Sequence, residues 1–308
     1  MILIGENIHI ISKRIQGALL ARDEEFILDL IKKQQNMDYI DLNVGPAKGE
    51  MQGILSWLCQ LVEKNSSLKI SFDSSNANEI QSALALCQDA SSSIINSTSA
   101  DAEKLETITD LAKKFDSNII ALTMNKTVGI PKTADERLAL AFEIIEKCQE
   151  KDIPNGKIFF DPLILPVSVE QSQALEAINT IQMIKQSFDP QVMTTIGLSN
   201  ISNGSPKEIR PLINKVFAAF AIGAGLDSFI LDAFDVELVE IIKNICAQTP
   251  QNEVQKLYCN LSDMIRDFSE LEEIPFDLND PKQAEIIKTA RILLNKDIYT
   301  HSYKFNCN

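Results

Sequence analysis

Short apolar runs recur along this chain of 308 residues, roughly 25 to 40 residues apart, and each ends on a carboxylate or an amide side chain. Apolar runs of this length with little alternation are typical of strands that are buried on both faces, as in parallel sheets. The sequence therefore predicts eight buried, parallel strands. They cover residues 1–7, 39–43, 68–73, 93–96, 118–125, 157–161, 194–200 and 226–232.

Between these runs, apolar residues recur at the spacing of a helix with one buried face. Two of the predicted helices open on a cap followed three residues later by a glutamate, Asn76 with Glu79 and Thr133 with Glu136, which predicts a reciprocal capping box at each. Helices are expected over about 23–36, 53–64, 77–86, 101–115, 134–145, 170–187, 211–224, 235–246, 253–268 and 283–295.

Alternation of strands and helices predicts an α/β fold with a parallel sheet and right-handed crossovers. Eight such units favour a closed (β/α)8 TIM barrel over an open, doubly wound sheet, and no G-x-G-x-x-G motif follows any strand. Because no linker interrupts the alternation, we expect a single domain over residues 1–308. The regular pattern breaks at about 248–282, which we interpret as an acidic insertion before the last helix.

The composition narrows the possible functions only slightly. A net charge of −14 argues against sequence-independent binding of nucleic acid, because phosphate contacts require clustered lysine and arginine. No apolar run approaches the ~18 residues of a membrane-spanning helix, and the N-terminus has no signal-peptide pattern, so we expect a cytoplasmic protein. The acidity by itself does not identify a function.

Six cysteines stand at positions 59, 87, 148, 246, 259 and 307, without a C-x-x-C pair or a Cys/His cluster. The usual ligand spacing of a structural zinc or iron–sulfur site is therefore missing. We expect buried free thiols in a reducing compartment.

The polar ends of the strands are the strongest candidates for chemistry, because parallel strands gather their last residues on one rim of a barrel. Asp and Asn also end strands simply because they form turns and cap helices, so any one of them fits either role. As a set, they offer donors and acceptors that suit the edge of a flat heterocycle with amino, ring-NH and oxo groups. The set is Glu6, Asn7, Asp41, Asn43, Asp73, Asn96, Asn125, Asp161, Asn200 and Asp232.

Other chemistries have weaker support in the sequence. Asp and Asn can bind Mg²⁺ or Ca²⁺, but no spacing selects a metal. Ser199 is not part of a G-x-S-x-G motif, which would mark a nucleophilic serine. The chain has two histidines, and His9 is placed just beyond the first strand. The loops at 124–132 and 203–210 carry basic residues and fit either a lid over an anionic substrate tail or ordinary solvated loops.

Eight short motifs follow one another in order along the chain. They are Ile4-Gly-Glu6, Asp41-Leu-Asn-Val-Gly-Pro46, Phe72-Asp-Ser74, Ile95-Asn-Ser-Thr98, Leu122-Thr-Met-Asn-Lys-Thr127, Asp161-Pro-Leu-Ile-Leu-Pro166, Gly197-Leu-Ser-Asn200 and Arg210-Pro-Leu-Ile-Asn214. Together they resemble the methyltetrahydrofolate:corrinoid/iron–sulfur protein methyltransferases. That family belongs to the pterin-binding barrels, with dihydropteroate synthase and the folate domain of methionine synthase. The resemblance covers about 1–245 and resumes near 287–305.

The resemblance implies a division of roles at the rim. Asp73, Asn96 and Asp161 would hydrogen-bond the pterin edge, and Asn200 would lie near N5, the nitrogen that bears the methyl group. The remaining folate-binding residues would be Asn43, Ser199, Asn203 and Arg210, with Glu6, Asp41, Asn125 and Asp232 orienting their neighbours. His9 and Asn7 depart from the family pattern, which usually has Asn and Arg there.

The resemblance also implies the reaction. The family transfers the N5 methyl group of methyltetrahydrofolate to the Co(I) of a corrinoid carried by a separate corrinoid/iron–sulfur protein, works as a homodimer and needs no metal of its own. Because a tertiary amine leaves poorly, N5 must gain a proton during transfer. We expect Asn200 to stabilise that protonated form in the transition state. A donor such as a methylated amine, and a pterin-binding subunit without turnover, remain open alternatives.

Overall fold

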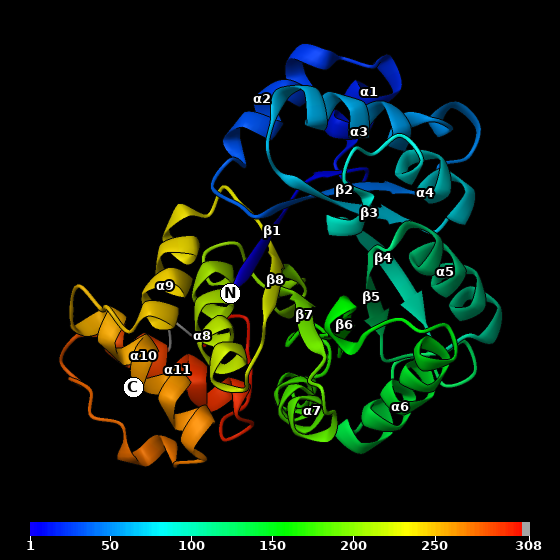
Figure 1. Ribbon diagram of the computed structural model, residues 1–308. Helices are drawn as coiled ribbons and strands as arrows, with labels where there is room; N and C mark the ends of the chain where they lie inside the picture. The colour runs from blue at the N-terminus through cyan, green and yellow to red at the C-terminus, as the bar shows by residue number, and fades with distance from the viewer. Residues whose placement is uncertain (304–308) are drawn as a thin grey trace.

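Eight parallel strands pair in chain order, and the eighth pairs with the first to close a barrel. The computed structural model describes residues 1–303 (Figure 1). This confirms the predicted TIM barrel. The strands are β1 (Ile2–His9), β2 (Tyr39–Gly45), β3 (Lys69–Ser74), β4 (Ile94–Ser99), β5 (Asn118–Leu122), β6 (Ile158–Asp161), β7 (Met193–Gly197) and β8 (Ser228–Leu231).

Helices surround the barrel, because each crossover between parallel strands returns along its outside (Figure 1). All ten predicted helices are present, with ends shifted by a few residues. The helices are α1 (Lys13–Ala21), α2 (Glu24–Lys33), α3 (Ile54–Asn65), α4 (Ala77–Leu84), α5 (Ala102–Phe115), α6 (Ala134–Glu150), α7 (Gln173–Ser187), α8 (Arg210–Gly223), α9 (Val236–Ala247), α10 (Glu253–Asp267) and α11 (Pro281–Leu293).

Helix α1 is the element that the hydrophobic pattern did not predict. Ser12 caps it by accepting the Ile15 N–H, yet Leu19 is its one fully buried residue, so the apolar periodicity is too weak to detect. The first strand also runs further than expected. His9 is its last residue rather than a loop residue.

Three predicted strand ends lie beyond their strands, and one of them, Asp232, stands one residue after the end of β8 at Leu231. Strand β5 ends at Leu122 and β7 at Gly197, so Asn125 and Asn200 each stand three residues further on. Asn125 belongs to a tight turn closed by a bridge to Gly129, and Asn200 lies in the 3-10 turn η4 (Leu198–Ser202). The Asn200 amide, which the resemblance places near N5, therefore lies on a turn above the barrel.

One of the two predicted capping boxes is present. The Thr133 hydroxyl accepts the Glu136 N–H, and the Glu136 carboxylate accepts the Thr133 N–H. The box predicted at Asn76 is wrong in its second half, because Glu79 turns away and accepts the N–H of Gly53 with both carboxylate oxygens, each at 3.0 Å. Glu79 thereby satisfies an amide at the start of α3, which has no cap of its own.

The barrel interior contains a layer of large apolar side chains below the rim, and the helices pack against the outside of the strands. Strand alternation then puts the residue two positions later on the same inner face, at the carboxyl end. The layer consists of Ile4, Tyr39, Ile94, Ile120, Phe159 and Ile230.

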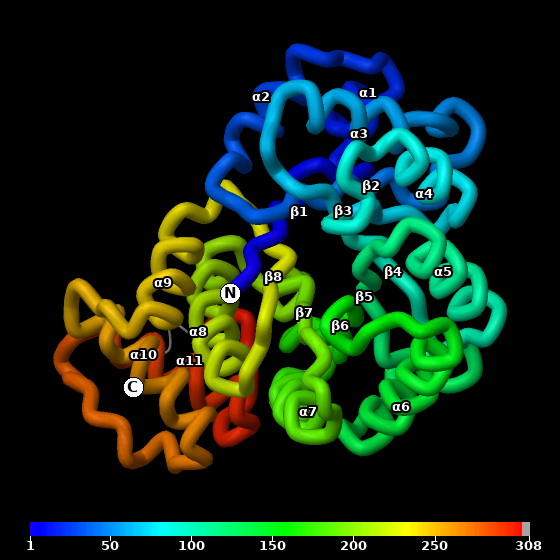
Figure 2. The backbone as a smooth tube through the Cα atoms, in the orientation of Figure 1, coloured from blue at the N-terminus to red at the C-terminus, as the bar shows by residue number. Residues whose placement is uncertain are grey.

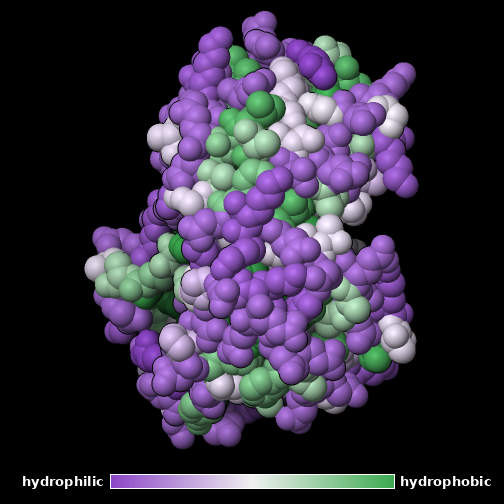
Figure 3. Space-filling model, turned by 45° about the vertical axis from the view of Figure 1, so that its right-hand side comes forward, coloured by the Kyte–Doolittle hydropathy of each residue, from purple (hydrophilic) through white to green (hydrophobic). Residues whose placement is uncertain are grey.

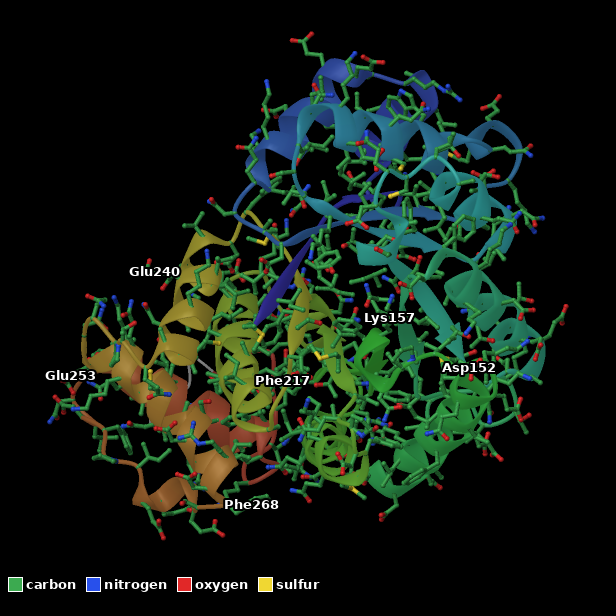
Figure 4. The ribbon with its side chains drawn as sticks, in the orientation of Figure 1. Asp152, Lys157, Phe217, Glu240, Glu253 and Phe268 are labelled. Atoms are coloured by element: carbon green, nitrogen blue, oxygen red, sulfur yellow. The ribbon has the colours of Figure 1, made fainter. Side chains whose placement is uncertain are left out.

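The segment expected to be an acidic insertion forms α10 and the acidic loop before α11. Helices α10 and α11 both pack on α8 (Figure 2). A Cβ at Gly223 would overlap the carbonyl oxygen of Ser262, so glycine permits this close approach of α8 and α10. Phe217 on α8 is buried there, whereas Glu240 on α9 and Glu253 on α10 lie at the outer edge (Figure 4).

On the face in view in Figure 3 hydrophilic residues dominate and hydrophobic ones form separate patches. Within residues 1–303 no helix is both long and apolar enough to span a membrane.

The described cysteines are free; Cys59, Cys148 and Cys259 are buried, but Cys246 is exposed, so the expectation of burial is wrong there. Cys307 lies outside the described residues.

Candidate functional site

Four of the polar strand ends lie in one row across the carboxyl ends of β1 to β4. The pairing of neighbouring strands places His9 beside Asn43, Asn43 beside Asp73, and Asp73 beside Asn96. The sequence predicted that these ends meet on one rim. The register adds that His9, the last residue of β1, belongs to the same row.

The residues of β2, β3 and β4 are bound to one another. Buried Asp41 accepts the Ser71 hydroxyl at 2.6 Å and the Asn96 amide at 3.1 Å. The Asn43 amide donates to Asp73. Asp41 therefore fixes the Asn96 side chain, and Asn43 fixes the Asp73 carboxylate, so this part of the rim is preorganised.

Two carboxyl groups lie close together in this network. Burial raises the pKa of Asp41 well above its ordinary value, and the charge of Asp73 raises it further. Burial also raises the pKa of Asp73, to about 6, although hydrogen bonds from Asn43 and Asp41 oppose the change. The arrangement favours a protonated Asp41 that donates to an ionised Asp73, which leaves Asp73 as the acceptor at the rim.

Lys104, in the first turn of α5, faces this network and was missed by sequence reasoning. Burial lowers the pKa of its partly buried ammonium, while the charges of Asp101 and Asp73 oppose that change. A lysine near the start of a helix carries no sequence signal of a site. The Lys104 ammonium acts on this network through its charge, which interacts with that of Asp73.

Asp161 ends β6 and is isolated from the other predicted residues. It is 8% exposed, and among the described residues its side chain accepts one hydrogen bond, from the Leu163 N–H at 2.8 Å. Burial raises its pKa to about 7, against the effects of the Leu163 N–H and the Arg137 charge. This carboxyl therefore changes between donor and acceptor near neutral pH.

A second network joins β1 to the segments after β7 and β8. The Ser199 hydroxyl donates to Glu6 at 2.5 Å, and the Asn7 amide donates to Asp232 at 2.6 Å. Burial raises the pKa of Glu6, which the bond from Ser199 opposes. Ser199 is thus tied to strand β1 by Glu6, which the sequence analysis assigned an orienting role.

His9 lies near this network with an unusual feature. Its Nδ1 atom is buried and has no hydrogen-bond partner within residues 1–303. Burial lowers the pKa of its imidazole, and Asp232 opposes that change. Among the described residues the buried Thr195 hydroxyl of β7, which the sequence analysis did not identify, also has no hydrogen-bond partner. Such groups indicate where a ligand or an ordered water can bind.

Asn200 is exposed, unlike Asp41, Asp73, Asn96 and Asp161. Its amide nitrogen lies over Gly197, 3.0 Å from the position of a Cβ at that residue. Among the described residues its side chain has no hydrogen-bond partner. The amide is therefore available to a ligand, and the absence of a side chain at Gly197 makes room for it.

Asn203 and Arg210, which the resemblance assigns to the border of the folate site, contact each other. The Arg210 guanidinium donates to the Asn203 side-chain oxygen at 3.1 Å and contacts the Ser202 hydroxyl at 3.4 Å. The Asn203 carbonyl accepts the Ser168 hydroxyl at 2.7 Å. These bonds join the loop after β7 to the loop after β6.

The loop after β5 is held in place at both ends. The Asn125 side-chain oxygen accepts the N–H groups of Thr127 and Val128. Buried Arg137 donates to the carbonyl of Pro131 at 3.0 Å. Asn125 therefore uses its acceptor to shape the loop.

Known proteins match the chain over most of its length. The family model described as "Pterin binding enzyme" matches residues 35–232. A methylcorrinoid:tetrahydrofolate methyltransferase of Eubacterium limosum is 27% identical over 236 residues, which cover 75% of this chain and 85% of that protein. A methionine synthase of Mycobacterium tuberculosis is 25% identical over 272 residues, 83% of this chain but 23% of that much longer protein.

Solved structures agree on the fold. A 7,8-dihydropteroate synthase from Vibrio fischeri superposes with a TM-score of 0.58 at 14% identity, over 82% of this chain and 94% of that chain. The dihydropteroate synthase of Yersinia pestis gives 0.57 at 13% identity, over 80% and 93%. With the family match across more than half of its residues, the chain belongs to the pterin binding enzymes.

Proposed function

We propose that this protein transfers the N5 methyl group of methyltetrahydrofolate to the Co(I) centre of a corrinoid carried by a separate protein. The observation that carries the proposal is the contrast at the rim between fixed acceptors on β2 to β6 and one unpaired amide, Asn200, above β7. Its support from relatives is the similarity to a methylcorrinoid:tetrahydrofolate methyltransferase, whose name writes the transfer in the opposite direction. One site stabilises one transition state in both directions.

In this proposal Asp73, Asn96 and Asp161 bind the edge of the pterin. Asp73 accepts from ring N–H or amino groups, and its orientation comes from Asn43. Asn96 offers the carbonyl oxygen that its bond to Asp41 leaves free. Asp161 supplies a further acceptor from the opposite part of the rim once it is ionised.

Asn200 acts on the reacting nitrogen. A neutral tertiary amine is a poor methyl donor, so transfer requires positive charge on N5. The carbonyl oxygen of the Asn200 amide can accept a hydrogen bond from protonated N5, with the proton arriving through water. That bond strengthens only as the charge develops, so it raises the rate more than it raises ground-state affinity.

Arg210, Asn203 and Ser199 border the rest of the folate. The Arg210–Asn203 pair presents a cation beside the site, which suits the anionic tail of a folate. Ser199, held by Glu6, stands next to Asn200 and fixes the turn that carries it. The nucleophile arrives on the partner corrinoid protein, so the site needs no metal of its own. We also propose a homodimer that leaves each rim open to this partner.

The test is the loss of the cob(I)alamin absorption after mixing the protein with methyltetrahydrofolate. The proposal expects protein-dependent formation of methylcobalamin and tetrahydrofolate in equal amounts. Activity with a methylated amine, and none with methyltetrahydrofolate, supports another donor. Tight folate binding with no consumption of cob(I)alamin supports a binding subunit, and either result refutes the proposal.

A further inference from the structure

Two thiols and a carboxylate converge at the amino-terminal end of the barrel, at the opposite end from the proposed site. Cys59 and Glu63 lie on the same face of α3, one turn apart, and Cys87 follows α4. One ligand atom from each, two sulfurs and a carboxylate oxygen, lie within 4.8 Å of one another. The thiols stand 28 positions apart in the sequence, which is why no cysteine spacing revealed the group.

The three side chains are held by the surrounding structure. One carboxylate oxygen of Glu63 accepts the Gln88 N–H at 2.6 Å, which leaves the other oxygen free. The Cys87 N–H bonds to the carbonyls of Ala83 at 3.0 Å and Leu84 at 3.3 Å, so its backbone is fixed at the end of α4. Cys59 is fully buried. Outer hydrogen bonds of this kind orient the ligands of metal sites.

Solvent can reach the group from one side. A cavity of about 270 Å³ is lined by Glu63 and Cys87, together with Lys69, Gln88 and Asp89. A water from this cavity can therefore complete a coordination shell that the protein leaves one ligand short. Lys69 adds positive charge beside a group that carries three negative charges when fully ionised.

We propose that Cys59, Glu63 and Cys87 bind one Zn²⁺, with a water from this cavity as the fourth ligand. Thiolates select soft or borderline cations over Mg²⁺ and Ca²⁺, and two sulfurs with one carboxylate form a tetrahedral zinc site. Tetrahedral Zn²⁺ with ordinary bond lengths separates its ligand atoms by about 3.6–3.8 Å. The three side chains need to approach by about 1 Å at most from their present positions.

A cation explains the third member of the group better than a disulfide does. Oxidation would join the two sulfurs and leave the second carboxylate oxygen of Glu63, which does not bind the Gln88 N–H, without a function beside them. Zn²⁺ displaces the thiol protons to solvent and pairs with all three groups. Bound Zn²⁺ would join α3 to the end of α4, so it stabilises the fold independently of methyl transfer.

The test is a Zn²⁺ titration of the reduced, metal-free full-length protein against a chromophoric chelator. The expected result is one Zn²⁺ per chain and a rise in melting temperature. Cys59→Ser and Cys87→Ser should each weaken binding at least ~10-fold. Cys246→Ser is the matched control, because that thiol is exposed on α9 and should leave Zn²⁺ affinity unchanged.

Glu63→Gln keeps the proposal testable if the buried cysteine variants fail to fold. Glutamine retains an oxygen for the Gln88 N–H but removes the charge, so Zn²⁺ affinity should fall ~10-fold with the fold intact. The Co²⁺ form should also show sulfur-to-metal charge-transfer absorption. Zn²⁺ binding that is equal in the wild type and the Cys59→Ser/Cys87→Ser double variant would overturn the proposal. So would a Cys59–Cys87 disulfide that persists in reductant.

Discussion

The two sides of the barrel rim carry the same residue types, Asp and Asn, in different hydrogen-bonding states. On the β2–β4 side, Asp41, Asn43, Asp73 and Asn96 bind one another, and Asp41 is buried. Above β7, Asn200 is exposed on a 3-10 turn, and its amide has no hydrogen-bond partner within residues 1–303. A fixed network recognises a ground-state shape. A free amide beside a reacting atom can respond to charge that appears only during the reaction.

The buried carboxyl groups of the rim also destabilise the folded state when they ionise. Burial raises the pKa values of Asp41, Asp73 and Asp161, which means that the folded state resists their ionised forms. Asn200 is neutral and exposed, so it carries no such cost. The comparison leads to separate expectations for binding, for rate and for stability.

Asn200→Ala should have the largest effect. We expect the rate of methyl transfer to fall by ~10²–10³, with a much smaller loss of folate affinity, because the lost hydrogen bond strengthens in the transition state. Single-turnover kinetics with methyltetrahydrofolate and cob(I)alamin measure the rate, and equilibrium titration measures the affinity. Equal losses in both quantities would contradict a catalytic role.

Asp161→Asn should mainly affect binding. We expect folate affinity to fall by ~10–100-fold, because the substitution replaces an ionised acceptor with a neutral amide in a buried position. The Leu163 N–H can still donate to the remaining side-chain oxygen, so local structure should persist. Titration of folate by fluorescence provides the measurement. Unchanged affinity would remove Asp161 from the pterin site.

Gly197→Ala tests how the Asn200 amide is positioned. The added Cβ would lie 3.0 Å from the amide nitrogen, closer than ordinary contact, so the amide must shift. We expect the transfer rate to fall ~10-fold, and no further loss when Gly197→Ala is combined with Asn200→Ala. Additive losses in this double-mutant cycle would show that the two residues act independently.

The pH dependence separates recognition from stability. The pKa of Asp73 is raised to about 6 and that of Asp161 to about 7, so both acceptors become ionised as the pH rises through this window. Folate affinity should therefore increase between pH 6 and about 8. Titrations at several pH values should show the increase, and Asp161→Asn should remove its upper part. A flat profile in the wild type would contradict the assigned acceptor roles.

Stability should change in the opposite direction with pH. A carboxyl that titrates at 3.8 when unfolded and at about 7 when folded leaves the unfolded state with fewer bound protons between these values. The free energy of unfolding thus falls as the pH rises through that window. Asp161→Asn removes this loss and should stabilise the folate-free protein at pH 8 by about 1–3 kcal/mol, measured by denaturant unfolding. Lower stability of the variant at pH 8 would contradict the raised pKa.

Most of the fold could be predicted from the sequence, because buried parallel strands and one-sided helices leave strong periodic patterns. Helix α1 escaped notice because it buries little apolar surface. The box expected at Asn76 failed because Glu79 found a partner in Gly53, which is distant in sequence. Contacts of this kind depend on tertiary packing and leave no local pattern.

The candidate site divides in the same way. The rim positions of Asp73, Asn96 and Asp161 could be predicted from the ends of their apolar runs, although β4 continues to Ser99, three residues beyond Asn96. The hydrogen bonds among them could not, because they depend on the register of neighbouring strands. Lys104 and the unpaired Thr195 hydroxyl carry no signal in the sequence, since a lysine on a helix and a threonine in a strand are ordinary.

The central claim is that Asp73, Asn96 and Asp161 at the rim bind the pterin while Asn200 promotes transfer. Single-turnover methyl transfer at saturating methyltetrahydrofolate tests it most directly in the wild type, Asn200→Ala and Asp161→Asn. The account predicts that Asp161→Asn approaches the wild-type rate once saturated, whereas Asn200→Ala stays ~10²–10³ slower at every concentration. An Asn200→Ala variant that recovers the wild-type rate at saturation would contradict it.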